Sequence, residues 1–535
     1  MYFTFNRHWL RGGVLLWLAA ATHLMLTVRA STLDTIGVTL LQAVTTNLNG
    51  TGVRVAQPEG DVNTNQPPTF EVNPAATSQP AGLFTYYSSS GTSTTYPNSV
   101  GGESGHAEQV AGSFYGIPGG VATNVAHVDN YDANNFLKAY YDVYTNLHAF
   151  LPSTNIDDPV VNQSFISSGS AVADQQVLDA CYDTYAAQYR TLFVSGAGNG
   201  GAVRAPSTCY NGISVGAYGG SSSIGPTRDN GRAKPDIVAP AGATSFSTPL
   251  VSGAAAMLLQ AAVRGDGGTP TNFAADIRTL KALLLNGAIK PADWTNGPSS
   301  PLDARYGAGV LNVFNSYEQL ASGRHPYIAS NSVPVGNPHP PTSAGGTVSK
   351  LSGWDFNTNA SSSTVDGVNH YYFNVTNGLA NAAFTATAAL VWNRQANQAS
   401  INNLDLFLFD ANSSNLIASC ASAVDNVEHL FVTRLPQGRY DLQVLKHGGT
   451  FVSAKEAYAL AFEFFSMSLD IAPSGTNAVI TWPIYPTGFV LESAPGLQAP
   501  IVWTTNNPSP VVSNGLERVT VDASSDNQLF RIRRP

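Results

Sequence analysis

The sequence predicts an α/β protein with a doubly wound parallel sheet, followed by all-β sandwich modules. From about residue 50 to residue 320 it alternates short β-branched runs with helical patterns, which is typical of a parallel sheet covered on both faces. Its later part carries short alternating strands separated by turn residues, with no helices between them. The composition agrees: of 535 residues 43% are hydrophobic and only 11% are charged, which excludes coiled coils and mainly disordered chains.

The first thirty residues are typical of a secretory signal peptide. Arg7 and Arg11 precede an apolar run over residues 12–28, and the small residue Ala30 ends the segment. An uncleaved membrane anchor is the alternative, because the run is about as long as a short spanning helix. We expect residues 1–30 to be removed from a secreted or cell-surface protein with no membrane contact afterwards. The net charge of −9 argues against nucleic-acid partners.

An α/β domain is expected over residues 31–325. Helical patterns span residues 136–147 and 171–189, between runs of β-branched and apolar residues. Alternation of strands and helices predicts parallel pairing through crossover connections. The expected strands are residues 53–56, 124–128, 160–162, 191–194 and 213–215.

The sequence changes character after this domain. Residues 326–346 are rich in proline, glycine and serine, and we expect them to form a linker. Alternating segments over residues 347–466 predict a β-sandwich, and a shorter set over residues 467–535 predicts a small β module.

A serine near the start of a predicted helix is the first candidate for chemistry. Ser245 lies in Ala-Thr-Ser-Phe-Ser-Thr-Pro-Leu-Val-Ser-Gly, where unpaired N–H groups and the helix dipole favour negative charge. Ser and Thr are also ordinary at helix starts, so position alone leaves both interpretations open. The segment closely resembles the serine signature of the subtilisin-like serine proteases, and Lys-Pro-Asp-Ile-Val-Ala-Pro upstream strengthens the likeness. The resemblance extends over about residues 50–322 and implies that Ser245 is the nucleophile.

A serine nucleophile needs a general base. His106 lies in Gly-His-Ala-Glu-Gln-Val-Ala-Gly, which is similar to the start of the family's catalytic histidine helix, so the resemblance implies that His106 is this base. His127 lies inside a predicted strand, and we expect it to be structural.

The acid of the triad departs from the family pattern. The family's Asp-Thr/Ser-Gly is absent. The segment 52–60 resembles the family's first strand and the residues after it, which implies that Glu59 occupies the position of the aspartate. Either carboxylate can orient an imidazole through its Nδ1–H if the backbone accommodates the extra methylene. Asp61 is a second candidate, and a third possibility is that Glu59 is a surface residue of an impaired enzyme.

Two further segments resemble the family's substrate cleft. Phe-Val-Ser-Gly-Ala-Gly-Asn-Gly implies that Asn199 is the side-chain donor of the oxyanion hole, although a Gly-Asn turn is the plain alternative. Val-Val-Asn-Gln-Ser-Phe implies that Ser164 lines the cleft beside Ser195 and Gly196.

These residues together predict a secreted serine endopeptidase that hydrolyses peptide bonds through an acyl-enzyme. A catalytically impaired pseudo-protease that acts as a surface binding module is the alternative. We expect polypeptide substrates, a monomer and no cofactor. Asp129 and Asp132 with neighbouring asparagines favour a turn and helix cap over a calcium site, so no metal site is predicted.

The remaining expectations concern the β modules and the cysteines. Residues 347–466 resemble the bacterial pre-peptidase C-terminal type of sandwich, and residues 467–535 resemble a fibronectin type III module. Three cysteines allow at most one internal disulfide. Cys181 and Cys209 either pair or are separately buried thiols, and Cys420 is left over in either case.

Overall fold

The structure is a computed structural model. It describes residues 31–60, 67–141, 156–167, 171–378, 382–496, 498, 500–505, 507–523 and 528–533. The expected signal peptide and Asp61 therefore lie outside the described residues. The contacts divide the chain into two compact units, of which the larger comprises Leu33–Ser466 with Tyr485–Thr487, and the smaller holds Met467–Ile484 and Gly488–Pro535.

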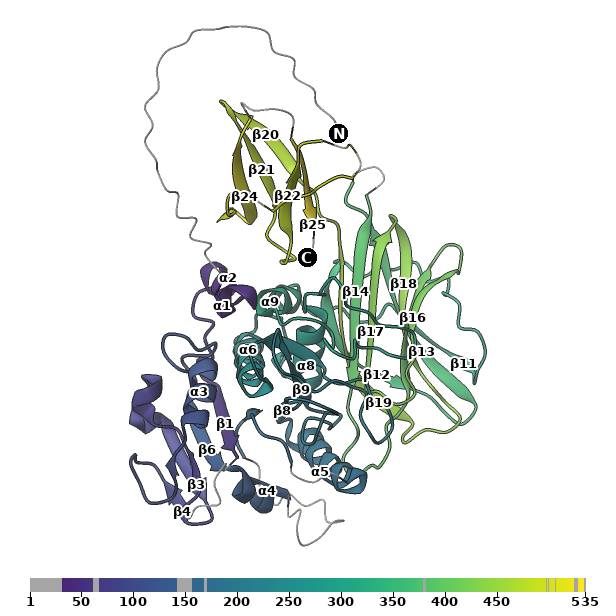
Figure 1. Cartoon of the computed structure of the whole chain (residues 1–535). Helices are drawn as coiled ribbons and strands as arrows, with labels where there is room; N and C mark the ends of the chain where they lie inside the picture. The colour runs from purple at the N-terminus through teal and green to yellow at the C-terminus, as the bar shows by residue number, and fades with distance from the viewer. Residues whose placement is uncertain are drawn as a thin grey trace, which may run out of the picture. The chain divides into compact units, whose positions relative to one another are not determined.

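An eight-stranded sheet forms the core of the first half of the larger unit (Figure 1). Its strand order is β10-β9-β8-β7-β1-β6-β3-β4, and every neighbouring pair is parallel except β3 with β4. On one side of β1 the chain adds β7, β8, β9 and β10 in sequence order, and on the other side β6 lies between β1 and the earlier strand β3. Parallel strands on both sides of β1 confirm the doubly wound α/β prediction. The strands are β1 (Arg54–Glu59), β3 (Phe84–Ser88), β4 (Gly91–Ser93), β6 (His127–Asp132), β7 (Val160–Gln163), β8 (Leu192–Gly196), β9 (Ile213–Tyr218) and β10 (Ile237–Pro240).

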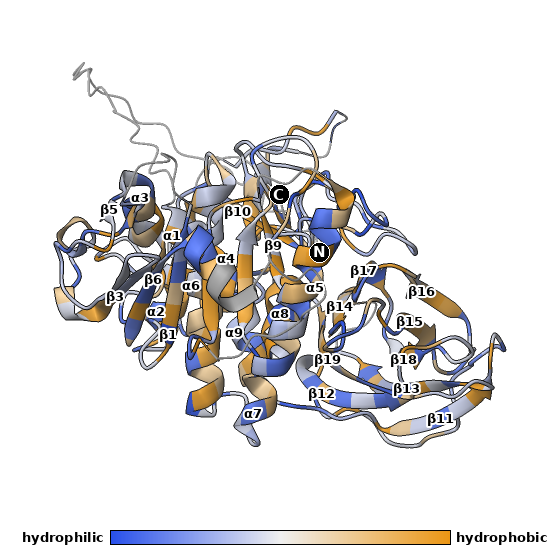
Figure 2. Cartoon of the chain, turned by 90° about the horizontal axis from the view of Figure 1, so that it is seen from below, coloured by the Kyte–Doolittle hydropathy of each residue, from blue (hydrophilic) through white to orange (hydrophobic). Residues whose placement is uncertain are grey.

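Helices pack against this sheet, and the longest apolar one is at its centre. In Figure 2 the orange, apolar ribbon gathers in the central strands and in α6 (Thr244–Arg264). Among the described residues α6 is the one helix long and apolar enough to cross a membrane, but 83% of its most apolar window is buried, as in a core helix. The other helices are α1 (Thr32–Thr35), α2 (Val38–Val44), α3 (Gly105–Phe114), α4 (Ala133–Tyr141), α5 (Val172–Tyr189), α7 (Thr271–Ala274), α8 (Ile277–Asn286) and α9 (Val313–Ala321).

A glycine allows α6 to lie close to the segment that follows α3. A Cβ added to Gly253 would lie 2.5 Å from the Cβ of Val121, so any larger residue would push the two segments apart. Helices α3 and α6 are in direct contact. This close packing sets the distance between the two helix starts that carry His106 and Ser245.

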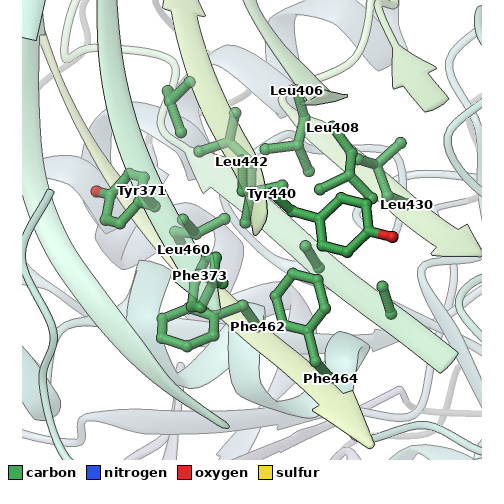
Figure 3. Packing of buried hydrophobic residues seen from close by; sticks show 14 of the residues in the cluster. Tyr371, Phe373, Leu406, Leu408, Leu430, Tyr440, Leu442, Leu460, Phe462 and Phe464 are labelled. Carbon is green, nitrogen blue, oxygen red and sulfur yellow. The ribbon is translucent and has the colours of Figure 1, made fainter. Parts of the chain in front are cut away.

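The second half of the larger unit is a β-sandwich, as predicted. A five-stranded sheet in the order β11-β13-β18-β15-β16 faces a four-stranded sheet in the order β12-β19-β14-β17, and aromatic and leucine side chains fill the space between them (Figure 3). The strands are β11 (Ala329–Pro334), β12 (Ser352–Ala360), β13 (Val365–Val375), β14 (Phe384–Trp392), β15 (Leu404–Asp410), β16 (Leu416–Cys420), β17 (Val427–Leu435), β18 (Gly438–Lys446) and β19 (Lys455–Phe465).

One part of the expected linker is structured. Ala329–Pro334 lies within the stretch 326–346 but forms β11, the edge strand that pairs antiparallel with β13. Pro334 is the last residue of this edge strand, a position where the missing N–H costs no ladder hydrogen bond. The proline-rich composition therefore predicted a linker where residues 329–334 form a strand.

The smaller unit has its own strands and core. A four-stranded sheet (β20-β21-β24-β23) and a two-stranded sheet (β22-β25) enclose Ile480, Trp482, Leu491, Val519 and Val521. The strands are β20 (Asp470–Ser474), β21 (Asn477–Pro483), β22 (Val490–Ala494), β23 (Val511–Ser513), β24 (Leu516–Asp522) and β25 (Leu529–Arg533).

The three cysteines are free thiols, so the expected alternative of a disulfide between Cys181 and Cys209 is not formed. Burial raises the pKa of Cys181 to about 11 and that of Cys209 to about 12, which keeps both thiols protonated and unreactive. Cys420 is also buried.

Candidate active site

The serine expected to be the nucleophile lies in the first turn of α6. Its helix begins after β10 and a short turn, and the N-cap residue Ala243 has extended backbone angles. Ser245 is half-buried, and its hydroxyl lies 3.5 Å from the Ser164 carbonyl oxygen. N–H groups in the first turn of a helix have no partner within the helix, which makes them available to an anion.

A carboxylate–imidazole pair lies at the carboxyl end of the sheet's central strand. Glu59 ends β1 and is fully buried, and His106 lies in the first turn of α3. Glu59 Oε2 and His106 Nδ1 are 2.9 Å apart, a normal hydrogen-bond length. The other carboxylate oxygen, Oε1, accepts a hydrogen bond of 2.9 Å from Gln57 Nε2.

The imidazole lies beside the start of the serine helix. The rings of His106 and Phe246, the residue after Ser245, have centroids 5.8 Å apart. The hydrogen bond to Glu59 raises the pKa of His106, while burial opposes that rise. An anion that bonds Nδ1 favours the imidazolium, as a general base requires when it accepts a proton.

An asparagine follows the end of β8 on the other side of the serine. Asn199 Oδ1 accepts hydrogen bonds from the Thr244 backbone N–H (2.9 Å) and from its hydroxyl (2.8 Å). A backbone N–H can only donate, so Oδ1 is fixed at this position and the amide orientation is determined. Asn199 is exposed, and within the described part of the chain its Nδ2 has no acceptor, so two N–H donors remain for a ligand.

Part of the chain matches a known protein family. Residues 50–309 match the subtilase family of peptidases. We call the part of the chain that these residues form the subtilase domain. Its central parallel sheet with packed helices agrees with a subtilisin-like α/β fold.

Several solved structures resemble the chain at low identity. A mutant of the protease domain of PatA is 23% identical over 52% of this chain and 98% of its own, with a TM-score of 0.34. The prenylagaramide maturation protease PagA is 19% identical over 54% and 99% (TM-score 0.34), and a protease from Pseudoalteromonas arctica is 17% identical over 51% and 91% (TM-score 0.33). No curated protein matches the chain significantly. Similarity at this level carries no conclusion about activity or substrate.

The three expected cleft residues of the subtilase domain, Ser164, Ser195 and Gly196, are all buried. Ser164 Oγ donates to the Ser245 carbonyl oxygen (2.9 Å), so it lies directly against the backbone of Ser245. Ser195 and Gly196 do not present side chains to a substrate. The Ser195 hydroxyl is buried and donates to Gln163 Oε1 (2.8 Å), and a Cβ on Gly196 would contact Thr248 and Thr244. Because successive residues of β8 point to opposite faces of the sheet, these two contacts lie on opposite sides of the strand.

Two other sequence candidates have structural contacts in the subtilase domain. His127 begins β6, at the end of the sheet away from Glu59, and its Nε2 lies near Thr85 (2.9 Å) and Asp129 (3.2 Å). Asp132 accepts from the N–H groups of Asn134 and Asn135 at the start of α4, which is a helix cap. Among the described residues, no group of three or more His, Cys, Asp or Glu side chains could hold a metal ion.

The sequence missed three residues that build this site. Thr244 fixes the Asn199 amide, Phe246 covers one side of the imidazole, and Gln57 binds the carboxylate of Glu59. Thr244 is within the serine signature and could have been noticed there. Nothing local in the sequence points to Gln57.

Proposed function

We propose that the subtilase domain is an active serine endopeptidase. Ser245 Oγ attacks the scissile carbonyl, and His106 accepts its proton and passes it to the leaving amine. Water then hydrolyses the acyl-enzyme by the same route in reverse. Glu59 orients the imidazole, and the Ser245 N–H with Asn199 Nδ2 stabilises the oxyanion.

The contact between Glu59 and His106 carries this proposal. A carboxylate only accepts hydrogen bonds, so a 2.9 Å contact requires the proton on Nδ1. The other ring nitrogen, Nε2, then has the lone pair that a general base uses. The same pair argues against an impaired domain, because Glu59 is buried on the imidazole rather than exposed in a loop.

The remaining expectations are part of the same proposal. Residues 1–30 direct export to the cell surface or beyond, and the mature monomer acts on polypeptides. The chemistry described uses side chains and backbone N–H groups alone, so it needs no cofactor.

Active-site labelling with a fluorophosphonate probe tests the proposal. We expect the folded wild-type protein to be labelled at Ser245, and folded Ser245→Ala to remain unlabelled. Internal cleavage of an unfolded protein substrate, read by mass spectrometry, separates an endopeptidase from an exopeptidase. Absence of Ser245-dependent labelling in folded protein would contradict catalysis and favour the binding-module alternative.

A further inference from the structure

A chain of hydrogen bonds continues from Glu59 into the interior of the subtilase domain. Gln57 Nε2 donates to Glu59 Oε1 (2.9 Å), and the Tyr115 hydroxyl donates to Gln57 Oε1 (2.6 Å). Gln57 and Glu59 are two residues apart on β1, so their side chains lie on the same face of the strand. Gln57, Glu59 and Tyr115 are all fully buried.

The Gln57 amide has every hydrogen-bonding group in use. Its Nε2 also donates to the Ala107 carbonyl oxygen (3.0 Å), so both N–H groups have acceptors. A carbonyl oxygen and a carboxylate cannot donate, which fixes Nε2 on this side and Oε1 toward Tyr115. Burial raises the pKa of Tyr115 well above its usual value, so its hydroxyl remains a donor.

These contacts attach the catalytic carboxylate to both ends of the histidine helix. Ala107 directly follows His106 in the first turn of α3, and Tyr115 is the C-cap residue of the same helix. Gln57 therefore ties the carboxylate to the backbone beside the imidazole and to the far end of that helix. A movement of α3 relative to β1 would break these bonds.

The glutamate side chain at position 59 requires more interactions to fix its carboxylate than an aspartate would. It has one more rotatable bond than the aspartate of the family pattern, so its carboxylate has more orientations to lose. We propose that Gln57 is a positioning residue that holds Glu59 on His106 Nδ1, with Tyr115 fixing the Gln57 amide. This inference rests on the proposed function, since it assigns these residues to the orientation of its acid.

Steady-state kinetics of Gln57→Met and Tyr115→Phe test the inference. Gln57→Met keeps an unbranched side chain and removes both donors. We expect it to lower kcat by about 10- to 100-fold with little change in KM, because misorientation acts on the chemical step. Tyr115→Phe should give a smaller loss of kcat. Adding it to Gln57→Met should give no further loss, because Tyr115 acts through Gln57.

Tyr86→Phe is the matched control. Tyr86 is fully buried nearby on β3, and its hydroxyl donates to the Val72 carbonyl oxygen (2.9 Å) without contacting the triad. We expect it to keep wild-type kcat. Equal losses of kcat in Tyr86→Phe and Tyr115→Phe would overturn the inference, as would wild-type kcat in folded Gln57→Met. If Gln57→Met fails to fold, the two phenylalanine variants still decide.

A spectroscopic readout separates this inference from the proposed function. The His106 Nδ1–H proton, bonded to Glu59, should give a far-downfield proton resonance in the wild-type protein. We expect that resonance to move upfield or broaden in Tyr115→Phe but not in Tyr86→Phe. An unchanged resonance in Tyr115→Phe would contradict the positioning role even if the wild-type protein proved inactive toward the fluorophosphonate.

Discussion

At Glu59 the side chain is one methylene longer than the aspartate of the family pattern, which adds about 1.5 Å of reach. The 2.9 Å contact with His106 shows that the backbone accommodates this length without placing the carboxylate too close. The carboxylate has one oxygen on the imidazole and the other on Gln57. This geometry supports our proposal that Glu59 takes the position of the family's aspartate, with Gln57 on the same strand holding its carboxylate.

The activity should depend on pH through His106. Its pKa is raised by the hydrogen bond to Glu59, and only the neutral imidazole is a base, so kcat/KM should rise with pH through a midpoint above the ordinary histidine value of about 6.5. In Glu59→Gln the anion is lost and burial remains, so the midpoint should fall. A pH profile of residual activity measures this. A midpoint that rises or stays constant would contradict the pairing.

The donor role of Asn199 is open to an isosteric test. Asn199→Asp keeps the acceptor for Thr244 and replaces the Nδ2 donors with an oxygen. Loss of one oxyanion donor typically lowers kcat by about 10²–10³-fold, and the added negative charge would deepen the loss. Folding is checked by thermal melting, and wild-type kcat in a folded variant would remove Asn199 from the oxyanion hole.

Sequence reasoning pointed to candidate residues that lie in local motifs. Ser245, His106, Asn199 and Glu59 each stand in a short recognisable segment, and the structure places each of them at the carboxyl end of the sheet or at a helix start. The roles of Gln57 and Tyr115 were not predicted. Their hydrogen bond depends on the position of α3 beside β1, and no short-range sequence pattern encodes a contact between residues so far apart in the chain.

At the scale of elements, the sequence predicted several regular helices and buried strands. It did not predict the exact ends of these elements or the strands at the edges of the sheets. The expected strand 124–128 starts instead at His127, and β3, β10 and β11 were not expected. Short apolar runs are ambiguous: the four-residue strand Val160–Gln163 was expected, whereas the four-residue strand Ile237–Pro240, which ends in a proline, was not. The expected helix 171–189 is α5, Val172–Tyr189.

The sandwich is fixed to the subtilase domain by a buried amide. Asn211 Nδ2 donates to the Arg394 carbonyl oxygen (2.9 Å), and Asn211 Oδ1 accepts from the Arg394 N–H (2.8 Å), as a neighbouring strand would. Helix α8 packs on β14 and β19 beside this bond. The two parts of the larger unit therefore share buried hydrogen bonds between a side chain and the backbone, as well as helix–strand packing.

We expect Asn211→Ala to lower the free energy of unfolding by roughly 2–5 kcal/mol, because it leaves a buried N–H and a buried C=O of Arg394 unpaired. Chemical denaturation of the whole protein measures the loss. Asn415→Ala is the control, since Asn415 is exposed in a sandwich loop and should change stability by less than about 0.5 kcal/mol. Equal stability of the two variants would contradict the role of this contact.

At the scale of the whole molecule, the chain comprises two compact units. The sequence predicted three domains: an α/β domain, a β-sandwich and a small β module. The subtilase domain and the sandwich share one unit, and the terminal module has a separate core of five buried side chains: Ile480, Trp482, Leu491, Val519 and Val521. The sequence could suggest how many domains the chain contains. It could not show which of these domains are joined by buried contacts.

Calorimetry of the whole protein should show two unfolding transitions, a large one for the unit Leu33–Ser466 and a small one for the terminal module. Asn211→Ala should lower the temperature of the large transition only. A third transition, or a sandwich that melts apart from the subtilase domain, would contradict the single larger unit.

The most direct test of the account is the kcat of Glu59→Gln. The substitution keeps the size of the side chain and removes the charge, while Glu71→Gln alters another buried carboxylate that does not contact the triad. We expect a loss in kcat of about 10²–10⁴-fold for Glu59→Gln and little change for Glu71→Gln, with both variants folded. Wild-type kcat in Glu59→Gln, with the loss appearing in Asp61→Ala instead, would contradict the assignment of Glu59 as the acid.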